Sequence, residues 1–311
     1  MTNTRRNIRA AVVTGPTGAI GQALLHLLCR EGVFVYAVVR PGSPRAARIT
    51  EGPSMKKVEC DLSELAKLPV LIPSADAFFH LAWEKTTGEG RNDMQAQVQN
   101  IRTSLDAVSA AGKLGARVFI GAGSQAEYGR VSGVLTPDTP CSPENGYGMA
   151  KLCAGEMTRM ECAKLGIDHI WMRILSVYGP YDGAGSMIMS TAEKLLDKEK
   201  PALTKGEQQW DYLYSGDAAE AFRLAALYGK NGKIYTLGSG KARPLRSYVE
   251  EMRDAVDPCL PLGFGEIPYS PQQVMHLSAD ISALAEDTGF TPCTEFSDGI
   301  RKTLEYIQRT R

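Results

Sequence analysis

Short apolar blocks alternate with amphipathic stretches through the first half of the chain. The blocks are rich in valine, isoleucine and phenylalanine and lead into glycine or polar residues, as strands of a buried sheet do. The stretches between them place apolar residues three or four positions apart, which is typical of helices with one buried face. The expected strands are Ile8–Val13, Val33–Val39, Lys56–Cys60, Ala77–Trp83 and Arg117–Ala122, and the clearest later helices are about 93–111 and 147–165.

Repeated strand–helix alternation predicts an α/β fold, a doubly wound parallel sheet with helices on both faces. A chain of 311 residues leaves room for a second, smaller unit. We expect residues 1–180, with returning segments near 210–240, to form the sheet domain, and about 182–210 with 240–311 to form a small C-terminal substrate-binding domain. Ligands of such sheets bind at the carboxyl ends of the strands.

A glycine turn stands at the first of these ends, between a strand and a helix. Gly15 can take a tight turn, Gly18 allows the backbone to approach a pyrophosphate, and Gly21 allows close packing of helix and strand. The free N–H groups at the start of the helix then face phosphate oxygens. The position of this turn predicts a dinucleotide site and therefore a Rossmann-type domain.

The end of the second strand indicates which dinucleotide binds. An acidic residue there bonds the ribose 2′-hydroxyl of NAD, whereas an arginine accommodates the 2′-phosphate of NADP. The residue is Arg40, followed by Ser43, Arg45 and Arg48, with no carboxylate before Glu51. We therefore expect NADP, with NAD possible if this basic loop is only solvated.

Composition and charge exclude several other classes of protein. The formal net charge is zero, which does not favour nucleic-acid binding. The seven cysteines are scattered, without a C-x-x-C pair, so neither structural zinc nor a disulfide framework is expected. Met1–Arg9 lacks the apolar core of a signal peptide, and no apolar run approaches the length of a membrane span. We expect a cytoplasmic protein that has no membrane partner and binds no metal.

Three residues in chain order offer the chemistry of hydride transfer. Ser124 ends the fifth strand, and Tyr147 and Lys151 lie four apart on one helix face. A phenol is a poor acid–base group at neutral pH, and a nearby ammonium would lower its pKa. Ser124 would hold the substrate oxygen near Tyr147, and Lys151 would also bond the nicotinamide ribose. The plainer interpretation is that Tyr147 and Lys151 form an ordinary surface pair.

Two other polar positions have structural interpretations. His80 is interpreted as a packed, hydrogen-bonded strand residue, since no other histidine is nearby. Asp61 fits either a helix cap or an adenine contact. The polar, glycine-containing segment Glu84–Arg91 is expected to be a mobile loop.

With these motifs in order, the chain resembles the extended short-chain dehydrogenase/reductase family of NAD(P)-dependent sugar epimerases, dehydratases and reductases. The resemblance covers most of the chain and rests on Thr14–Gly21, Phe79–Ala82, Asn100, Ser124–Gly129, Tyr147 with Lys151, Arg173–Pro180, Ala279–Asp280 and Gly289–Pro292. It implies an enzyme whose catalytic residues are Ser124, Tyr147 and Lys151. It also implies a homodimer, formed by the helices near 93–111 and 147–165.

The motifs and the resemblance together give the expected binding residues. For the cofactor they are Gly15, Thr17, Gly18, Ala19, Ile20, Gly21, Arg40, Asp61, Leu62, Leu81, Ala82, Trp83, Asn100, Tyr147, Lys151 and Ile174. For the substrate they are Ser124, Gln125, Ser176 and Trp210.

The chain departs from the family pattern at several positions. Ala126 stands where the 4,6-dehydratases carry an acid, and Glu127 does not obviously replace it, which disfavours dehydration. Trp210 stands where an arginine usually binds the substrate diphosphate, and a later family arginine also has no counterpart. Ser176 occupies a position where many members have asparagine. Trp210 fits a ring-stacking role and a core role equally well.

The function expected from the sequence is NADP(H)-dependent reduction of a keto-sugar. The substrate implied by the resemblance is a nucleotide-linked 4-keto-6-deoxy sugar. The alternative within the family is a nucleotide-sugar 4-epimerase with a retained NAD. An alternative of another class is a non-catalytic NADP-sensing protein, against which the Tyr147–Lys151 pair argues.

Overall fold

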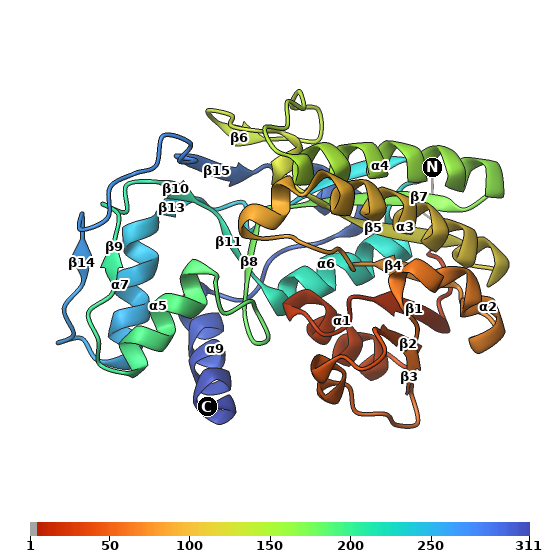
Figure 1. Cartoon of the computed structure of the whole chain (residues 1–311), viewed down its shortest axis with the longest axis horizontal. Coiled ribbons are helices and arrows are strands. Elements are labelled where there is room, and N and C mark those ends of the chain that lie inside the picture. The colour runs from red at the N-terminus through yellow and green to blue at the C-terminus, as the bar shows by residue number, and fades with distance from the viewer. Residues whose placement is uncertain (1–4) are drawn as a thin grey trace.

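A seven-stranded parallel sheet forms the centre of the larger part of the molecule (Figure 1). In this computed structural model, which describes residues 5–311, the strand order is β12-β7-β5-β4-β1-β2-β3. The strands are β1 (Ala10–Thr14), β2 (Phe34–Val39), β3 (Met55–Glu59), β4 (Ala77–His80), β5 (Val118–Ser124), β7 (Asp168–Ile174) and β12 (Lys233–Leu237). Every pairing between them is parallel. Residues 1–4, part of the segment considered for a signal peptide, lie outside the described residues.

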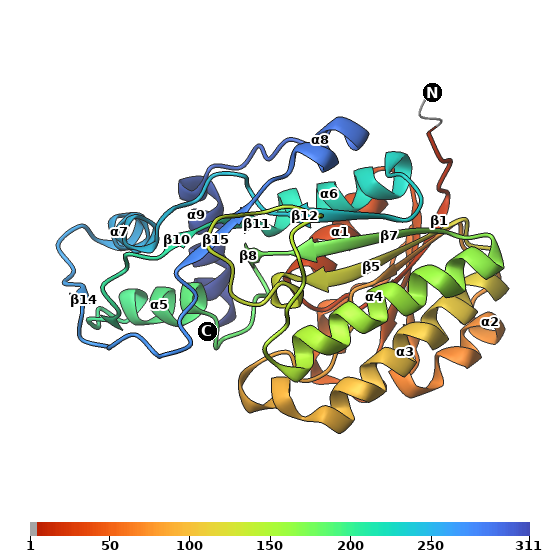
Figure 2. The ribbon, with the colours of Figure 1, turned by 90° about the horizontal axis from the view of Figure 1, so that it is seen from above.

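Helices cover both faces of this sheet, which confirms the expected fold class (Figure 2). One face carries α1 (Ala19–Arg30), α6 (Ser215–Tyr228) and α8 (Ser282–Thr288). The other carries α2 (Leu68–Leu71), α3 (Met94–Lys113) and α4 (Gly146–Leu165), with α3 and α4 packed together. Two apolar cores result, one on each side of the sheet.

Helix α4 shows how local sequence sets the bounds of an element that carries the site. The Asn145 side chain accepts a hydrogen bond from the Gly148 N–H at 2.9 Å and caps the start. Gly166 ends the helix with a left-handed φ of 68°, a conformation that favours glycine. Asp93 caps α3 in the same manner through the Ala96 N–H. The sequence therefore predicted both helices nearly to the residue.

Later segments of the chain build the smaller part of the molecule around an aromatic and aliphatic core. Its helices are α5 (Met187–Leu196), α7 (Leu245–Val256) and α9 (Phe296–Thr310). Its strands form a sheet of β13 (Arg243–Pro244), β10 (Gln209–Trp210), β15 (His276–Ala279) and β6 (Val134–Leu135), with the two-stranded pairs β11 (Tyr212–Tyr214) with β8 (Ser176–Tyr178) and β14 (Gly263–Phe264) with β9 (Ala202–Leu203).

The boundary between the two parts is less simple than the sequence suggested. Helix α8 belongs to the stretch 240–311 expected in the smaller part, yet it packs on α6 and β12 of the larger one. Leu284 and Phe290 are buried in that core. The division of the chain into two domains stays a prediction. Within residues 5–311, none of the helices is long and apolar enough to cross a membrane.

Four short 3₁₀ helices complete the fold at the carboxyl edge of the sheet and beside it. They are η1 (Pro44–Arg48), η2 (Leu62–Lys67), η3 (Gly88–Asn92) and η4 (Gln125–Glu127). Each follows the end of β2, β3, β4 or β5, the positions at which the sequence placed its candidate ligand-binding residues.

Candidate active site

The glycine turn between β1 and α1 has the geometry that its residue types predicted. Gly15 has a φ of +68°, and a Cβ there would lie 2.7 Å from the Ala82 backbone nitrogen. A Cβ on Gly21 would lie 2.3 Å from the carbonyl oxygen of Gly15. Gly18, by contrast, faces open space and is the N-cap of α1. The turn is closed on its protein side and open at Gly18, a cradle that fits a pyrophosphate.

A cavity of about 490 Å³ runs from this turn along the carboxyl edge of the sheet. Thr17, Arg40, Leu62 and the segment Leu81–Glu84 contribute to its walls. Ala19 and Ile20 open α1 behind the turn, where Ile20 packs against the core. The cavity therefore brings together half of the sixteen residues expected to bind a dinucleotide.

Asp61 is the N-cap of η2, the first of its two expected roles. Its carboxylate accepts hydrogen bonds from the Ser63 N–H at 2.9 Å and the Ser63 hydroxyl at 2.7 Å. These bonds, more than the nearby Arg40, hold the pKa of this carboxyl below its usual range. Its neighbours Cys60 and Leu62 line the cavity, so an adenine contact stays a prediction.

The basic loop after β2 divides into groups with different surroundings. Arg40 and Arg45 line the cavity with Ser43, but Arg48 donates to the Thr17 carbonyl at 2.9 Å and faces the Tyr181 ring at 5.3 Å. Sequence reasoning sought a carboxylate only close to Arg40 along the chain. The fold supplies Glu84 from the segment that follows β4, 3.9 Å away and half-exposed.

Ser124, Tyr147 and Lys151 meet beside this cavity. The Ser124 hydroxyl is close enough to the phenol of Tyr147 to lower its pKa, and Lys151 donates to the Ala122 carbonyl at 2.6 Å. The Lys151 ammonium lies 3.7 Å from the centroid of the Trp83 ring and 5.8 Å from that of Tyr147. Strand β5 and helix α4 thus bring together residues more than twenty positions apart in the chain, as the sequence predicted.

One electrostatic expectation is wrong for this state of the site. Burial raises the pKa of the Tyr147 phenol, and the Ser124 hydroxyl and the Arg91 guanidinium only offset part of that effect. Burial also lowers the pKa of Lys151 to about 7. Lys151 is turned toward the Ala122 carbonyl and the Trp83 face and is itself discouraged from carrying charge. It therefore does not lower the phenol pKa as the sequence suggested.

Glu127, left without a role by the sequence, is fully buried beneath Ser124. One carboxylate oxygen accepts from the Ser124 N–H at 2.8 Å and from the Trp171 indole N–H at 3.0 Å. The other pairs with Arg173 at 2.7 Å. Ala126 is also buried, and its methyl side chain offers no acid to the site. Glu127 therefore fixes the segment that carries Ser124 against β7.

Trp171 fills the space between β5 and α4. A Cβ on Gly121 or Gly123 would lie 2.2 Å and 2.4 Å from atoms of its ring, and a Cβ on Gly155 of α4 would lie 2.9 Å away. Three glycines on two elements thus make room for one indole.

The segment after β4 is held by α3 and is not the free loop that was expected. Asn100 accepts from the Glu84 N–H and donates to the Glu84 carbonyl, each at 3.0 Å. Gln97 bonds the Trp83 indole N–H at 2.9 Å and the Gly90 carbonyl at 3.0 Å. The Asn100 side chain, expected to contact the cofactor, instead bonds the backbone of Glu84. Sequence reasoning missed Gln97, which only its buried position on α3 identifies.

The expected substrate residues lie farther along the same edge. Ile174 pairs in register with Ser124, and Gln125 follows on η4. The Trp210 indole donates to the Ser176 hydroxyl at 2.9 Å. Trp210 also lines a separate cavity of about 450 Å³, in whose wall Lys194 is the one cationic side chain. Trp210 is thus half-buried, with one face in the core and one in the cavity.

His80 has the structural role that the sequence assigned to it. The ring is buried, with Nδ1 2.9 Å from the Thr14 hydroxyl and Nε2 3.3 Å from the Ser104 hydroxyl. Burial lowers its pKa to about 3, so the ring stays neutral and ties β1 and β4 to α3.

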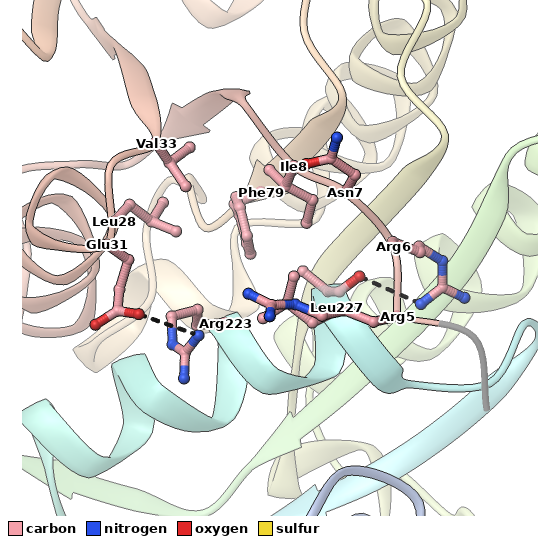
Figure 3. A pocket seen from close by; sticks show the side chains of 11 residues that line it. Arg5, Arg6, Asn7, Ile8, Leu28, Glu31, Val33, Phe79, Arg223 and Leu227 are labelled. Atoms are coloured by element: carbon pink, nitrogen blue, oxygen red, sulfur yellow. Dashed lines mark hydrogen bonds and ion pairs between the residues drawn. The ribbon is translucent and has the colours of Figure 1, made fainter. Parts of the chain in front are cut away.

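A further pocket lies at the opposite, amino-terminal edge of the sheet (Figure 3). Two of its arginines are engaged: Arg223 faces Glu31 at 3.6 Å, and Arg6 bonds Asp168 outside the pocket wall at 2.7 Å. The residues expected to bind cofactor and substrate lie away from this wall, so the candidate active site is the carboxyl edge.

Comparisons with known proteins agree with this geometry. A sequence profile of the "NAD dependent epimerase/dehydratase family" matches residues 11–238. The chain is 23% identical to dTDP-glucose 4,6-dehydratase of Streptomyces niveus over 82% of its own length and 76% of that protein. It is 26% identical to dTDP-6-deoxy-L-talose 4-dehydrogenase (NAD(+)) of Aggregatibacter actinomycetemcomitans, over 77% and 88%.

A solved structure shares the whole architecture. UDP-glucose 4-epimerase of Thermus thermophilus, complexed with NAD, superposes with a TM-score of 0.84 at 20% identity, over 96% of this chain and 99% of that one. The profile match spans most of the chain, from β1 to the end of β12. The protein is therefore an enzyme of the NAD dependent epimerase/dehydratase family, of the extended short-chain dehydrogenase/reductase type.

Proposed function

We propose that this enzyme reduces the ketone of a nucleotide-linked keto-sugar with NADPH. The observation that carries the proposal is the meeting of the Ser124 hydroxyl, the Tyr147 phenol and the Lys151 ammonium beside the cavity of the glycine turn. The glycine cradle and the Arg40 rim fit a dinucleotide phosphate. When bound, reduced nicotinamide supplies the hydride to the carbonyl carbon.

The side chains then manage the proton that must reach the carbonyl oxygen. Tyr147 donates its phenolic proton to that oxygen, and the Ser124 hydroxyl holds the oxygen through a hydrogen bond. The raised pKa of the phenol keeps it protonated and ready to act as the acid. Lys151 orients the ribose, and solvent returns a proton to the tyrosinate that remains.

Loss of water from the sugar is disfavoured in this proposal, although a dehydratase is among the relatives. An acid is needed to protonate the leaving hydroxyl. Ala126 has none, and the Glu127 carboxylate is buried and engaged with Arg173 and Trp171. Neither residue offers a carboxylic acid to a substrate beside Ser124.

A 4-epimerase is the second candidate, supported by the fold match to an epimerase holding NAD. Both reactions use the same three side chains, but an epimerase returns the hydride and retains its cofactor. The test is to supply nucleotide-linked 4-keto sugars that differ at C6, among them the dTDP-4-keto-6-deoxy sugar expected from Ser124–Gly129, and follow absorbance at the nicotinamide band. A reductase oxidises one NADPH for each sugar reduced. Interconversion of a UDP-sugar pair without added cofactor would instead establish the epimerase.

Cofactor preference gives the first testable prediction. We expect NADPH to bind more tightly than NADH by roughly 1–3 kcal/mol, because a charge-assisted contact from Arg40 reaches only the 2′-phosphate. Arg40→Asp should reverse the preference in calorimetric titration. The matched control is Arg102→Asp on α3, an exposed arginine outside the cavity wall. Tighter binding of NADH to the unaltered protein would contradict the assignment and leave Glu84 as the residue facing the ribose.

The oligomeric state gives the second testable prediction. The outer faces of α3 and α4 expose large apolar side chains, among them Val98 (61% exposed) and Met160 (60%). We propose that these faces pair with those of a second copy, because exposed apolar side chains gathered on adjacent helices mark association surfaces. Light scattering should give a dimer mass for the wild type and a monomer mass for Val98→Asp with Met160→Asp. A monomeric wild type at micromolar concentration would refute the dimer.

A further inference from the structure

Arg91 is a cation at the catalytic centre to which the proposed chemistry gives no role. It belongs to η3, and its guanidinium carbon lies 4.8 Å from the centroid of the Tyr147 ring. It is also one of the groups that lower the pKa of that phenol. The Arg91 guanidinium therefore lies next to Tyr147, the proposed proton donor to the reacting carbonyl.

Arg91 has a buried guanidinium nitrogen, Nε, without a hydrogen-bond partner among residues 5–311. Within the same residues, no ion pair to a carboxylate involves its guanidinium, whereas the buried Arg173 pairs with Glu127. Burying a polar group without a partner is unfavourable, and native structures rarely do so unless a ligand completes the site. Arg91 thus has the features of a side chain that awaits an anion.

The backbone on both sides of Arg91 is anchored, so this position is built into the fold. Asn92 accepts a hydrogen bond from the Gly146 N–H at 3.1 Å, which ties η3 to the start of α4. The Gly90 carbonyl accepts from Gln97 at 3.0 Å, and Lys85 pairs with Asp93. Both helices that frame the site therefore hold Arg91 beside Tyr147.

The dinucleotide is a poor match for this guanidinium. The cavity of the glycine turn includes Arg40, Arg45 and the segment up to Glu84 in its walls, but Arg91 is not among them. The phosphates of the cofactor are thus accounted for elsewhere. The anion at Arg91 belongs to the second ligand, the sugar.

We propose that Arg91 binds a carboxylate carried by the sugar next to the carbon that reacts, so that the substrate is a uronic-acid type of nucleotide sugar. The inference rests on the proposed function, since Tyr147 marks the reacting carbon. In a hexose, a carboxylate on C5 is the nearest anionic substituent to C4, and a planar guanidinium binds it through two parallel hydrogen bonds. The 6-deoxy sugar was expected from Ser124–Gly129 alone. With Arg91 taken into account, we expect a carboxylate at C6 in place of the methyl group.

Binding measurements test this without requiring turnover. Protein loaded with NADP is titrated calorimetrically with UDP-glucuronate and with UDP-glucose, which differ only at C6, a carboxylate in the first and a hydroxymethyl group in the second. We expect the wild type to prefer the glucuronate by about ten- to a hundredfold, the value of charge-assisted hydrogen bonds. Arg91→Gln should bring the two affinities within about twofold while leaving the affinity for UDP-glucose and NADP unchanged. Arg91→Lys should keep part of the preference, and Arg102→Gln should keep all of it.

Three results would overturn the proposal. Equal binding of the two sugars by the wild type would show that the carboxylate is not recognised. Equal weakening of both by Arg91→Gln would show that Arg91 has a structural role only. Loss of NADP affinity in that variant assigns Arg91 to the cofactor. If neither UDP-sugar binds, the same comparison with glucuronate and glucose decides the matter. Absence of NADPH oxidation with any keto-sugar would remove the reductase and leave the measured preference standing.

Discussion

Replacing Tyr147 with phenylalanine is expected to slow single-turnover hydride transfer by about a hundred- to ten-thousandfold. The change removes the acid that protonates the carbonyl oxygen but keeps the ring that packs against Trp83. Cofactor affinity should barely change, because the phenol is not the main cofactor anchor. The measurement is stopped-flow loss of NADPH absorbance after mixing the loaded enzyme with a 4-keto nucleotide sugar.

Two further variants show whether the three residues act as a unit. Ser124→Ala should lower the rate with little effect on cofactor binding, whereas Lys151→Met should damage both. Combined losses should be less than additive, as for residues that share one step. A Tyr147→Phe enzyme that keeps most of the wild-type rate would make Tyr147 and Lys151 an ordinary helix pair, worth a few tenths of a kcal/mol in stability.

Removing the Glu127 carboxylate is expected to cost about 3–5 kcal/mol in the free energy of unfolding, the typical effect of breaking a buried ion pair. Glu127→Ala strands the Arg173 guanidinium, whose side chain is 4% exposed. It also deprives the Ser124 N–H and the Trp171 indole of their acceptor. Urea denaturation followed by circular dichroism gives the value. Glu127→Gln, which keeps the volume and one acceptor oxygen, provides a milder variant if the alanine protein does not fold.

The control for this prediction is a solvent-exposed ion pair that also joins a glutamate and an arginine. Glu156 bonds Arg159 on the exposed face of α4, and Glu156→Ala should cost less than about 1 kcal/mol. Pairing Glu127→Ala with Arg173→Met should recover part of the loss, since no buried charge is then unpaired. Equal costs at Glu127 and Glu156 would show that burial of the first pair has no energetic consequence.

The order of elements in the larger part follows from local sequence. Gly15 predicted a tight turn and Gly21 a close approach of helix and strand; Gly15 has a positive φ, and a Cβ on Gly21 would meet the Gly15 carbonyl oxygen. Asn145 and Gly166 bound α4 because a cap and a left-handed residue are encoded locally. Ser124 and Tyr147 meet because parallel strands end at one edge, a rule that needs only the alternation of strands and helices.

What the sequence did not predict depends on contacts between distant segments. The Glu84 carboxylate reaches Arg40 from the segment that follows β4, so a search along the chain near Arg40 could not find it. Burial reverses the expected effect on the Tyr147 pKa, and burial is a property of the whole site. Arg91 gives no signal in a polar, glycine-containing segment, and only its place over the Tyr147 ring distinguishes it.

The Trp171 indole gives the site a mechanical property as well as a packed core. Because it stands between glycines of β5 and α4, the thickness of one aromatic ring sets the gap between the strand that ends in Ser124 and the helix that carries Tyr147. The indole acts as a spacer of fixed width. Its N–H donates to Glu127, which holds the ring in one orientation. The relative position of Ser124 and Tyr147 is thus set by a buried ring that lies outside the wall of the cavity at the glycine turn.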